Sequence, residues 1–263
     1  MKYAFSTLGL PGTPLDRAAA LAASHGFHGL ELRAHPEEPL HPGTPAAERA
    51  AGLRTLGAAG ITALGIAGYA QVAAPGEDEP VLAELRGLVG LAADLEAPYV
   101  RVFPGGGDQP EAAADARAVR RLRAAAPFAE RHGVRILLET HDSHRTAAAA
   151  ARVLDAVARP GAGALWDVLH TWLGGESPAE SLRTLGPHLG YVQVKDVASP
   201  RELTPLGLGA GTLPLAEAVR AAPPDGWLCW EYEKRWYPAA AELPAQLTRG
   251  REYLERLLAS RPG

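Results

Sequence analysis

The chain has 263 residues, of which 47% are hydrophobic and 21% are charged, and its formal net charge is -4. This composition is typical of a globular protein with a large core, and the length suits a single α/β barrel of about 250 residues. The mildly acidic balance provides no basic surface for a polyanion, so we expect neither a nucleic-acid partner nor an anionic membrane surface.

The single cysteine and the N-terminal residues further restrict the class of protein. Cys229 is the only cysteine, which excludes a disulfide framework. The N-terminal stretch MKYAFSTLGL leads directly into a predicted strand, without the pattern of a signal peptide. No apolar run approaches the roughly 20 residues of a membrane-spanning helix. We therefore expect a cytoplasmic protein.

Short strand-like runs alternate with helical segments rich in Ala, Leu and Arg. The expected strands are 3–9, 29–34, 62–68, 99–105, 135–141, 163–169, 190–197 and 228–234. The expected helices are near 14–25, 44–59, 79–95, 111–132, 146–157, 178–186, 213–222 and 240–259. This alternation predicts a closed parallel (β/α)8 barrel, with an open doubly wound sheet as the alternative. Because no linker interrupts it, residues 1–263 are expected to form one domain.

Polar residues in these strands share one phase. Side chains alternate between the two faces of a strand, so Glu139 opposes Leu138 in the run LLETH. The same holds for Glu31, Arg33, Arg101, Asp167, Gln193, Lys195 and Glu231. A solvent-facing antiparallel sheet would also alternate, but helices between the strands imply parallel strands with both faces covered. The polar side chains are therefore expected to converge at the carboxyl-end mouth of the barrel.

This convergence predicts a metal site. Glu139, Asp167 and Glu231 would form a confined group of carboxylates, whose mutual repulsion would raise at least one pKa unless a cation neutralised them. A divalent metal ion is the simplest such cation, and the amide oxygen of Gln193 would be a fourth ligand. Oxygen ligands favour Mn²⁺ or Mg²⁺ over Zn²⁺, and Co²⁺ is a plausible substitute.

The ordered set of these residues resembles the xylose-isomerase-like TIM-barrel family. The residues that carry the resemblance are Glu139 in LLETH, Asp167 and His170 in WDVLH, Gln193 in VQVKD, and Glu231 in CWEYE. The segment TPLGLGAGTLPL at 204–215 also resembles the family's loop after the seventh strand, and its GLGAG lacks the full spacing of a nucleotide-binding loop. The family includes hydroxypyruvate isomerases, ketose 3-epimerases, and inosose and 3-dehydroshikimate dehydratases.

The resemblance implies a divalent-metal-dependent isomerase or epimerase. Its substrate would be a small sugar, sugar phosphate or hydroxy-keto acid, which reacts by proton transfer through a metal-bound enediolate. Glu139 and Glu231 would be metal ligands that double as the acid/base pair, while Asp167 and Gln193 would be purely structural ligands. His170 would hydrogen-bond a substrate hydroxyl and help to polarise the carbonyl.

Several other residues are candidates for substrate binding. Lys195 follows Gln193 by two residues on the same face, and it would bind a carboxylate or phosphate or donate a proton. Its alternative is an ion pair with a neighbouring acid. The further candidates are Arg201, His141, Glu31 and Arg101, with solvated salt bridges or structural hydrogen bonds as alternatives.

Other functions stay open at this point. Gln193 stands where ketose 3-epimerases usually carry His, and Arg145 stands where they place a second substrate-binding Glu. A metal-dependent dehydratase of the 3-dehydroshikimate or inosose type is therefore the alternative enzyme. A non-catalytic binding barrel is a further alternative, whereas the acidic charge argues against an endonuclease IV-like nuclease. Members of the family are often dimers or tetramers, so the resemblance also allows a homo-oligomer.

Overall fold

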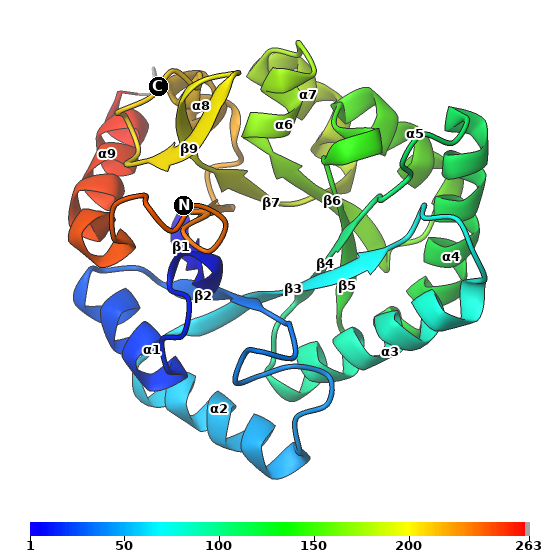
Figure 1. Cartoon of the computed structure of the whole chain (residues 1–263), viewed down its shortest axis with the longest axis horizontal. Helices are drawn as coiled ribbons and strands as arrows, with labels where there is room; N and C mark the ends of the chain where they lie inside the picture. The colour runs from blue at the N-terminus through cyan, green and yellow to red at the C-terminus, as the bar shows by residue number, and fades with distance from the viewer. Residues whose placement is uncertain (261–263) are drawn as a thin grey trace.

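A closed barrel of parallel strands forms the centre of the molecule (Figure 1). The computed structural model describes residues 1–260, and within them the barrel strands follow the order β1-β10-β7-β6-β5-β4-β3-β2. Their bounds are β1 Lys2–Ser6, β2 Gly29–Arg33, β3 Thr62–Gln71, β4 Tyr99–Phe103, β5 Arg135–Glu139, β6 Ala162–Asp167, β7 Leu189–Val194 and β10 Trp227–Trp230. Phe5 of β1 pairs with Leu30 on one side and Trp230 on the other, which closes the barrel. The predicted barrel is confirmed, and the open sheet is wrong.

Helices surround the barrel on the outside (Figure 1). Their bounds are α1 Leu15–Ser24, α2 Ala46–Ala58, α3 Asp78–Asp94, α4 Glu111–Arg131, α5 Ala147–Val157, α6 Val168–Leu173, α7 Pro178–Leu185, α8 Leu215–Ala221 and α9 Leu247–Ala259. Local signals start some of them: Ser177 and Glu180 form a capping box at α7, with Pro178 in its first turn. The helices cover the apolar outer faces of strands whose neighbours are parallel.

The inside of the barrel is built in layers. An apolar floor consists of the inward side chains Leu137, Leu165, Tyr191 and Cys229, which belong to one buried cluster. Two residues further along the chain comes a polar layer of Glu139, Asp167, Gln193 and Glu231. Side chains two residues apart in a strand lie on the same face, so the polar layer stands above the apolar floor at the carboxyl ends of the strands.

The strand predicted at 163–169 is wrong beyond Asp167, because a helix begins there. The Asp167 carboxylate oxygen Oδ1 accepts the backbone N–H of Leu169 at 2.8 Å, which makes Asp167 the N-cap of α6. The strand predicted at 228–234 likewise ends at Trp230, and the helix predicted at 240–259 begins at Leu247 after a 3₁₀ turn at Leu243–Gln246. The other predicted elements agree with the observed ones to within a few residues at their ends.

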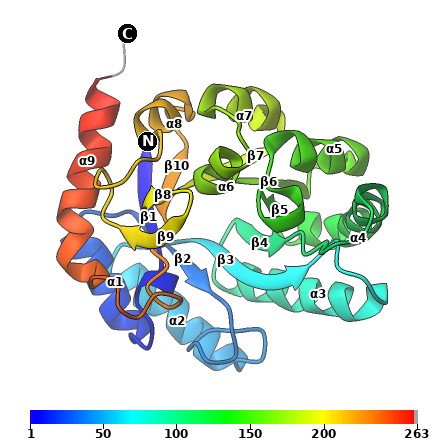
Figure 2. The same cartoon turned by 45° about the horizontal axis from the view of Figure 1, so that its top comes forward.

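A hairpin after β7 was not predicted. The strand predicted at 190–197 ends at Val194, and β8 Asp196–Ser199 then pairs antiparallel with β9 Glu202–Leu206. The hairpin lies beside α8 and α9 (Figures 1 and 2). The turn residues fall among polar and proline-containing positions, so this segment carries no long apolar run that would indicate two further strands.

The glycine-rich segment that follows the hairpin wraps around a carboxylate. Asp196 accepts backbone N–H groups from Gly209, Gly211 and Leu213 at 2.9, 3.0 and 3.2 Å. A Cβ atom at Gly211 would lie 2.2 Å from Asp196 Oδ1, so glycine is required for this close approach. The donors of GLGAG are therefore used inside the protein, which agrees with the prediction that this is no nucleotide loop.

Candidate metal centre and active site

The polar layer collects at the carboxyl ends of neighbouring strands. Register pairs Glu139 of β5 with Leu165 of β6, and Asp167 of β6 with Gln193 of β7. Glu231 directly follows β10, the other neighbour of β7. All four side chains of the polar layer are buried, which brings their polar atoms into one confined space as the shared phase predicted.

Oxygen atoms of this layer are placed to receive a cation. Ligand atoms of Glu139, Asp167 and Glu231 lie within 4.8 Å of one another. Gln193 Oε1 accepts no hydrogen bond from any residue that the structure describes, and Glu139 Oε2 has an ion pair with Arg101 but no hydrogen bond there. Buried polar atoms are almost always hydrogen-bonded, so the unpartnered Gln193 oxygen indicates that a further group completes the site. The donor set fits a hard divalent cation.

The balance of charge points in the same direction. Four buried carboxylates, Glu31, Glu139, Asp167 and Glu231, share the interior with the cations Arg101 and Lys195. With all four ionised, the group would be short of two positive charges. A divalent ion would supply them, whereas without it burial raises the pKa of Glu139 and of Glu31, because an uncompensated carboxylate in a low-dielectric interior is costly.

Lys195 lies within the carboxylate group. Its ammonium nitrogen is 2.8 Å from Asp167 Oδ2, 2.8 Å from Glu233 Oε1, and in contact with Glu231 Oε2. Burial alone would lower the pKa of Lys195, but Asp167, Glu231 and Glu233 together raise it well above the usual value. The ion pair named as the alternative for this lysine is therefore present, and its contact with a substrate stays a prediction.

Arg101 is the second cation of the group. Its Nε lies 3.2 Å from Glu139 Oε2, and its Nη1 donates to the carbonyl oxygen of Gly68 at 3.0 Å. The guanidinium also stacks over the ring of Phe103, 4.0 Å from the ring centroid. With 3% of its surface exposed, Arg101 is held by the protein itself, and its predicted role in substrate binding stays untested.

Glu139 and Glu231 differ in their electrostatic surroundings. Burial raises the pKa of Glu139 to about 8, against the opposing effects of Arg101 and His141. Burial would also raise the pKa of Glu231, but Lys195 and Arg101 outweigh it and lower that pKa. The two carboxylates therefore differ in proton affinity, as an acid/base pair requires.

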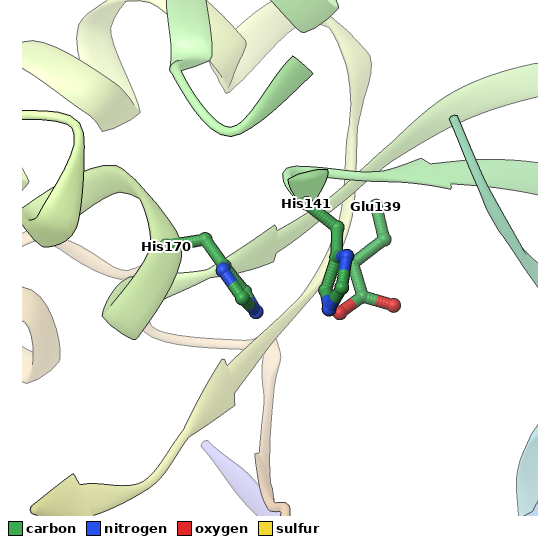
Figure 3. Close-up of side chains that lie close together, drawn as sticks. All are labelled: Glu139, His141 and His170. Carbon is green, nitrogen blue, oxygen red and sulfur yellow. The ribbon is translucent and has the colours of Figure 1, made fainter. Parts of the chain in front are cut away.

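Two histidines stand beside Glu139 at the mouth (Figure 3). The rings of His141 and His170 lie 4.0 Å apart between centroids, and both come close to the Glu139 carboxylate. His170 reaches this place because α6 starts immediately after Asp167, and its Nε2 lies 3.8 Å from Asp167 Oδ2. Burial, with His141 and Lys195, lowers the pKa of His170 well below its usual value, so His170 is neutral near pH 7.

His141 carries the opposite tendency. Its Nδ1 lies 3.2 Å from Asp142 Oδ2, and Asp142 in turn accepts the backbone N–H of Gly105 at 3.1 Å. Burial would lower the pKa of His141, but the hydrogen bond with Asp142 and the charge of Glu139 raise it. The side chain is 32% exposed, so it offers a protonatable group on the solvent side of the polar layer.

The structure places the two remaining predicted substrate-binding residues differently, and the substrate contact of Glu31 stays a prediction. Glu31 is completely buried, and it accepts hydrogen bonds from Tyr191 and Gln193 rather than facing solvent. Arg201 is exposed in the turn between β8 and β9, and none of its interactions within the described residues joins it to the polar layer. Sequence reasoning missed Glu233 and Tyr191, although both follow the two-residue alternation that singled out Glu231 and Gln193.

Comparison with known proteins places the chain in a family. A family model described as xylose isomerase-like TIM barrel matches residues 19–257. The chain belongs to this family. The xylose isomerase-like fold extends over almost the whole sequence, which confirms the resemblance seen in the ordered set of site residues. No curated protein matches the sequence.

Solved structures of other xylose isomerase-like barrels are similar over nearly their full length. A D-psicose 3-epimerase with D-tagatose from Clostridium cellulolyticum H10 has 18% identity and a TM-score of 0.84, covering 98% of this chain and 99% of that chain. IolI with a bound zinc atom has 20% identity and a TM-score of 0.80, with 97% and 98% covered. The probable 3-DHS dehydratase AsbF from Bacillus anthracis has 19% identity and a TM-score of 0.78, with both chains fully covered. At these sequence identities, the similarity shows that the fold is shared and no more than that.

Within the described part of the chain, no helix has the length and hydropathy needed to span a membrane.

Proposed function

We propose that the protein is a divalent-metal-dependent isomerase or epimerase acting on a small sugar, a sugar phosphate or a hydroxy-keto acid. The observation that carries the proposal is the polar layer: the carboxylates of Glu139, Asp167 and Glu231 lie close together, Glu139 and Glu231 differ in proton affinity, and Gln193 Oε1 accepts no hydrogen bond from the described residues. Glu139, Asp167, Gln193 and Glu231 would hold the ion, with Mn²⁺ or Mg²⁺ favoured by the oxygen ligands. When bound, it would supply a Lewis acid for the substrate carbonyl and its neighbouring hydroxyl.

The residues of the chain would then move the proton. Glu231, kept ionised by Lys195 and Arg101, would take the proton from the carbon beside the carbonyl. Glu139, whose pKa is raised to about 8, would give its proton on the other side of the substrate. Neutral His170 would donate a hydrogen bond to a substrate hydroxyl, which orients the reacting carbon.

A dehydratase is the second candidate because of the pair His141–Asp142. An elimination needs an acid for the departing hydroxyl, and His141 has a raised pKa at the solvent side of the layer. Lys195 would be a second source of positive charge near a substrate carboxylate. Loss of the hydroxyl creates a conjugated product that absorbs ultraviolet light, whereas isomerisation of the same substrate does not.

The test is a screen of ketoses, ketose phosphates and hydroxy-keto acids with Mn²⁺ in deuterium oxide. Proton exchange at the carbon beside the carbonyl would be followed by NMR, and absorbance would report dehydration. We expect the wild-type protein to catalyse exchange on at least one compound and Glu139→Gln to lose at least about a hundredfold in rate, because it lacks one carboxyl group of the acid/base pair. The control Glu252→Gln removes an exposed carboxylate outside the barrel and should keep the wild-type rate. Equal rates in the wild-type protein and Glu139→Gln would contradict the proposal.

A further inference from the structure

Gln193 is the one amide in the polar layer, and a chain of hydrogen bonds beneath it fixes its orientation. The Gln193 Nε2 donates to Glu31 Oε2 at 2.8 Å and to Glu231 Oε1 at 3.3 Å. The hydroxyl of Tyr191 donates to the same oxygen of Glu31. All of these side chains are buried, so water does not compete for the bonds.

The two carboxylates beside Gln193, those of Glu31 and Glu231, determine which end of the amide faces them. An amide has a donating NH₂ and an accepting oxygen, and two carboxylate oxygens on one side attract the NH₂ and repel the oxygen. The Gln193 Oε1 must therefore point the other way, where it accepts no hydrogen bond from the described residues. Glu31 is the nearer of the two acceptors, at 2.8 Å.

The residues joined by these hydrogen bonds come from separate parts of the barrel. Tyr191 and Gln193 share the inward face of β7, while Glu31 lies on β2, which β1 and β10 separate from β7. Glu31 therefore crosses the interior of the barrel, and its carboxylate is used by Tyr191 and Gln193. A buried carboxyl group is costly unless its oxygen atoms are hydrogen-bonded.

We propose that Glu31, held by Tyr191, is a positioning residue that fixes the Gln193 amide with its NH₂ toward Glu31 and Glu231, which leaves its carbonyl oxygen free to bind a cation. The proposal rests on the proposed function, because that oxygen is the atom expected to bind the divalent ion. Groups that orient a metal ligand without touching the metal commonly contribute about 10- to 100-fold to metal affinity. Glu31 therefore acts on the ion through Gln193, and substrate contact is no part of its role.

The measurement is the Mn²⁺ dissociation constant by titration calorimetry for a set of full-length variants. Glu31→Leu removes the acceptor, so the amide of Gln193 can rotate, and we expect binding to weaken by about 10- to 100-fold. Tyr191→Phe removes only the donor that steadies Glu31 and should weaken binding less. Glu31→Gln keeps an accepting oxygen for Gln193 and should lose no more than Glu233→Gln, a matched control that removes one negative charge elsewhere in the group.

A double-mutant cycle separates positioning from a general effect on the barrel. In the Gln193→Ala background the Glu31→Leu change should cost little further affinity, because the ligand that Glu31 positions is gone. An undiminished loss in that background, or equal losses in Glu31→Leu and Glu31→Gln, would overturn the inference while leaving the proposed function intact. A wild-type protein that binds no divalent ion would overturn both. Thermal unfolding of each variant would verify that it is folded.

Discussion

Glu139 and Glu231 are chemically similar, and their surroundings make them different. Glu139 is buried beside Arg101, and its pKa is raised to about 8, while the pKa of Glu231 is lowered by the ammonium of Lys195 and by Arg101. One carboxyl group therefore binds a proton near neutral pH and the other releases it. An environment that separates two pKa values in this way assigns acid and base roles within one fold.

The raised pKa of Glu139 predicts a dependence of stability on pH. The folded protein retains the Glu139 proton up to about pH 8, whereas the unfolded chain releases it near pH 4.5. Between these pH values the unfolded state binds fewer protons at Glu139 than the folded state does. The contribution of Glu139 to the free energy of unfolding therefore falls by up to about 1.4 kcal/mol for each unit that the pH rises. Chemical unfolding from pH 5 to 8 in buffers with a chelator should show this loss. The Glu139→Gln variant should show a weaker dependence, and an identical slope would contradict the prediction.

The sequence predicted which side chains point inward but not what they contact. Alternation placed Glu139, Asp167 and Gln193 on one face, and the structure brings them together. It could not decide between an ion pair and a substrate for Lys195, because that depends on distances between strands far apart in the chain. For the same reason it could not show that Glu31 accepts hydrogen bonds from Tyr191 and Gln193.

At the scale of elements, short segments after the strands shape the mouth. The N-cap bond of Asp167 begins α6 and so brings His170 next to the polar layer. The hairpin β8–β9 and the glycine-rich segment behind it are held by Asp196. The regular helices and strands were predictable from periodicity. These short connections were not, since they depend on single hydrogen bonds rather than on hydrophobic patterns.

The hydrogen bonds that Asp196 accepts predict that its removal destabilises the protein. The Asp196→Ala change would leave the N–H groups of Gly209, Gly211 and Leu213 without their acceptor. We expect the free energy of unfolding in urea to fall by about 1–3 kcal/mol, the usual cost of buried groups left unpaired. Glu202→Ala, an exposed change in β9 of the same hairpin, is the control and should stay within about 0.5 kcal/mol of wild type. An equal effect of the two changes would show that Asp196 does not hold this segment.

The barrel as a whole couples the ends of the chain to the site. Closure through β1 and β10 fixes Glu231, which directly follows β10, against strands from the middle of the chain. The alternation of strands and helices made this architecture predictable, because few other folds satisfy it at this length. The loops that would select a substrate carry no comparable pattern, so the substrate could not be predicted.

A ligand that joins several strands should stabilise the whole molecule. If Mn²⁺ binds the polar layer, a free concentration about a hundredfold above its Kd should add about 2.7 kcal/mol to the free energy of unfolding. Thermal unfolding with increasing Mn²⁺ would measure the rise in Tm. The Gln193→Ala variant should need a higher concentration for the same shift. A rise of the same size in a variant that lacks Glu139, Asp167 and Glu231 carboxylates would place the ion elsewhere.

The apolar floor has a consequence for the order of events during a reaction cycle. Leu137, Leu165, Tyr191 and Cys229 close the barrel beneath the polar layer, while His141 and Glu233 retain contact with solvent above it. Anything that enters or leaves therefore uses the same opening. An ion would have to arrive before the substrate, and a bound substrate would obstruct its escape. The protein with substrate bound would then exchange its ion more slowly than the protein without substrate. Bound substrate would in this way protect the protein against loss of the ion.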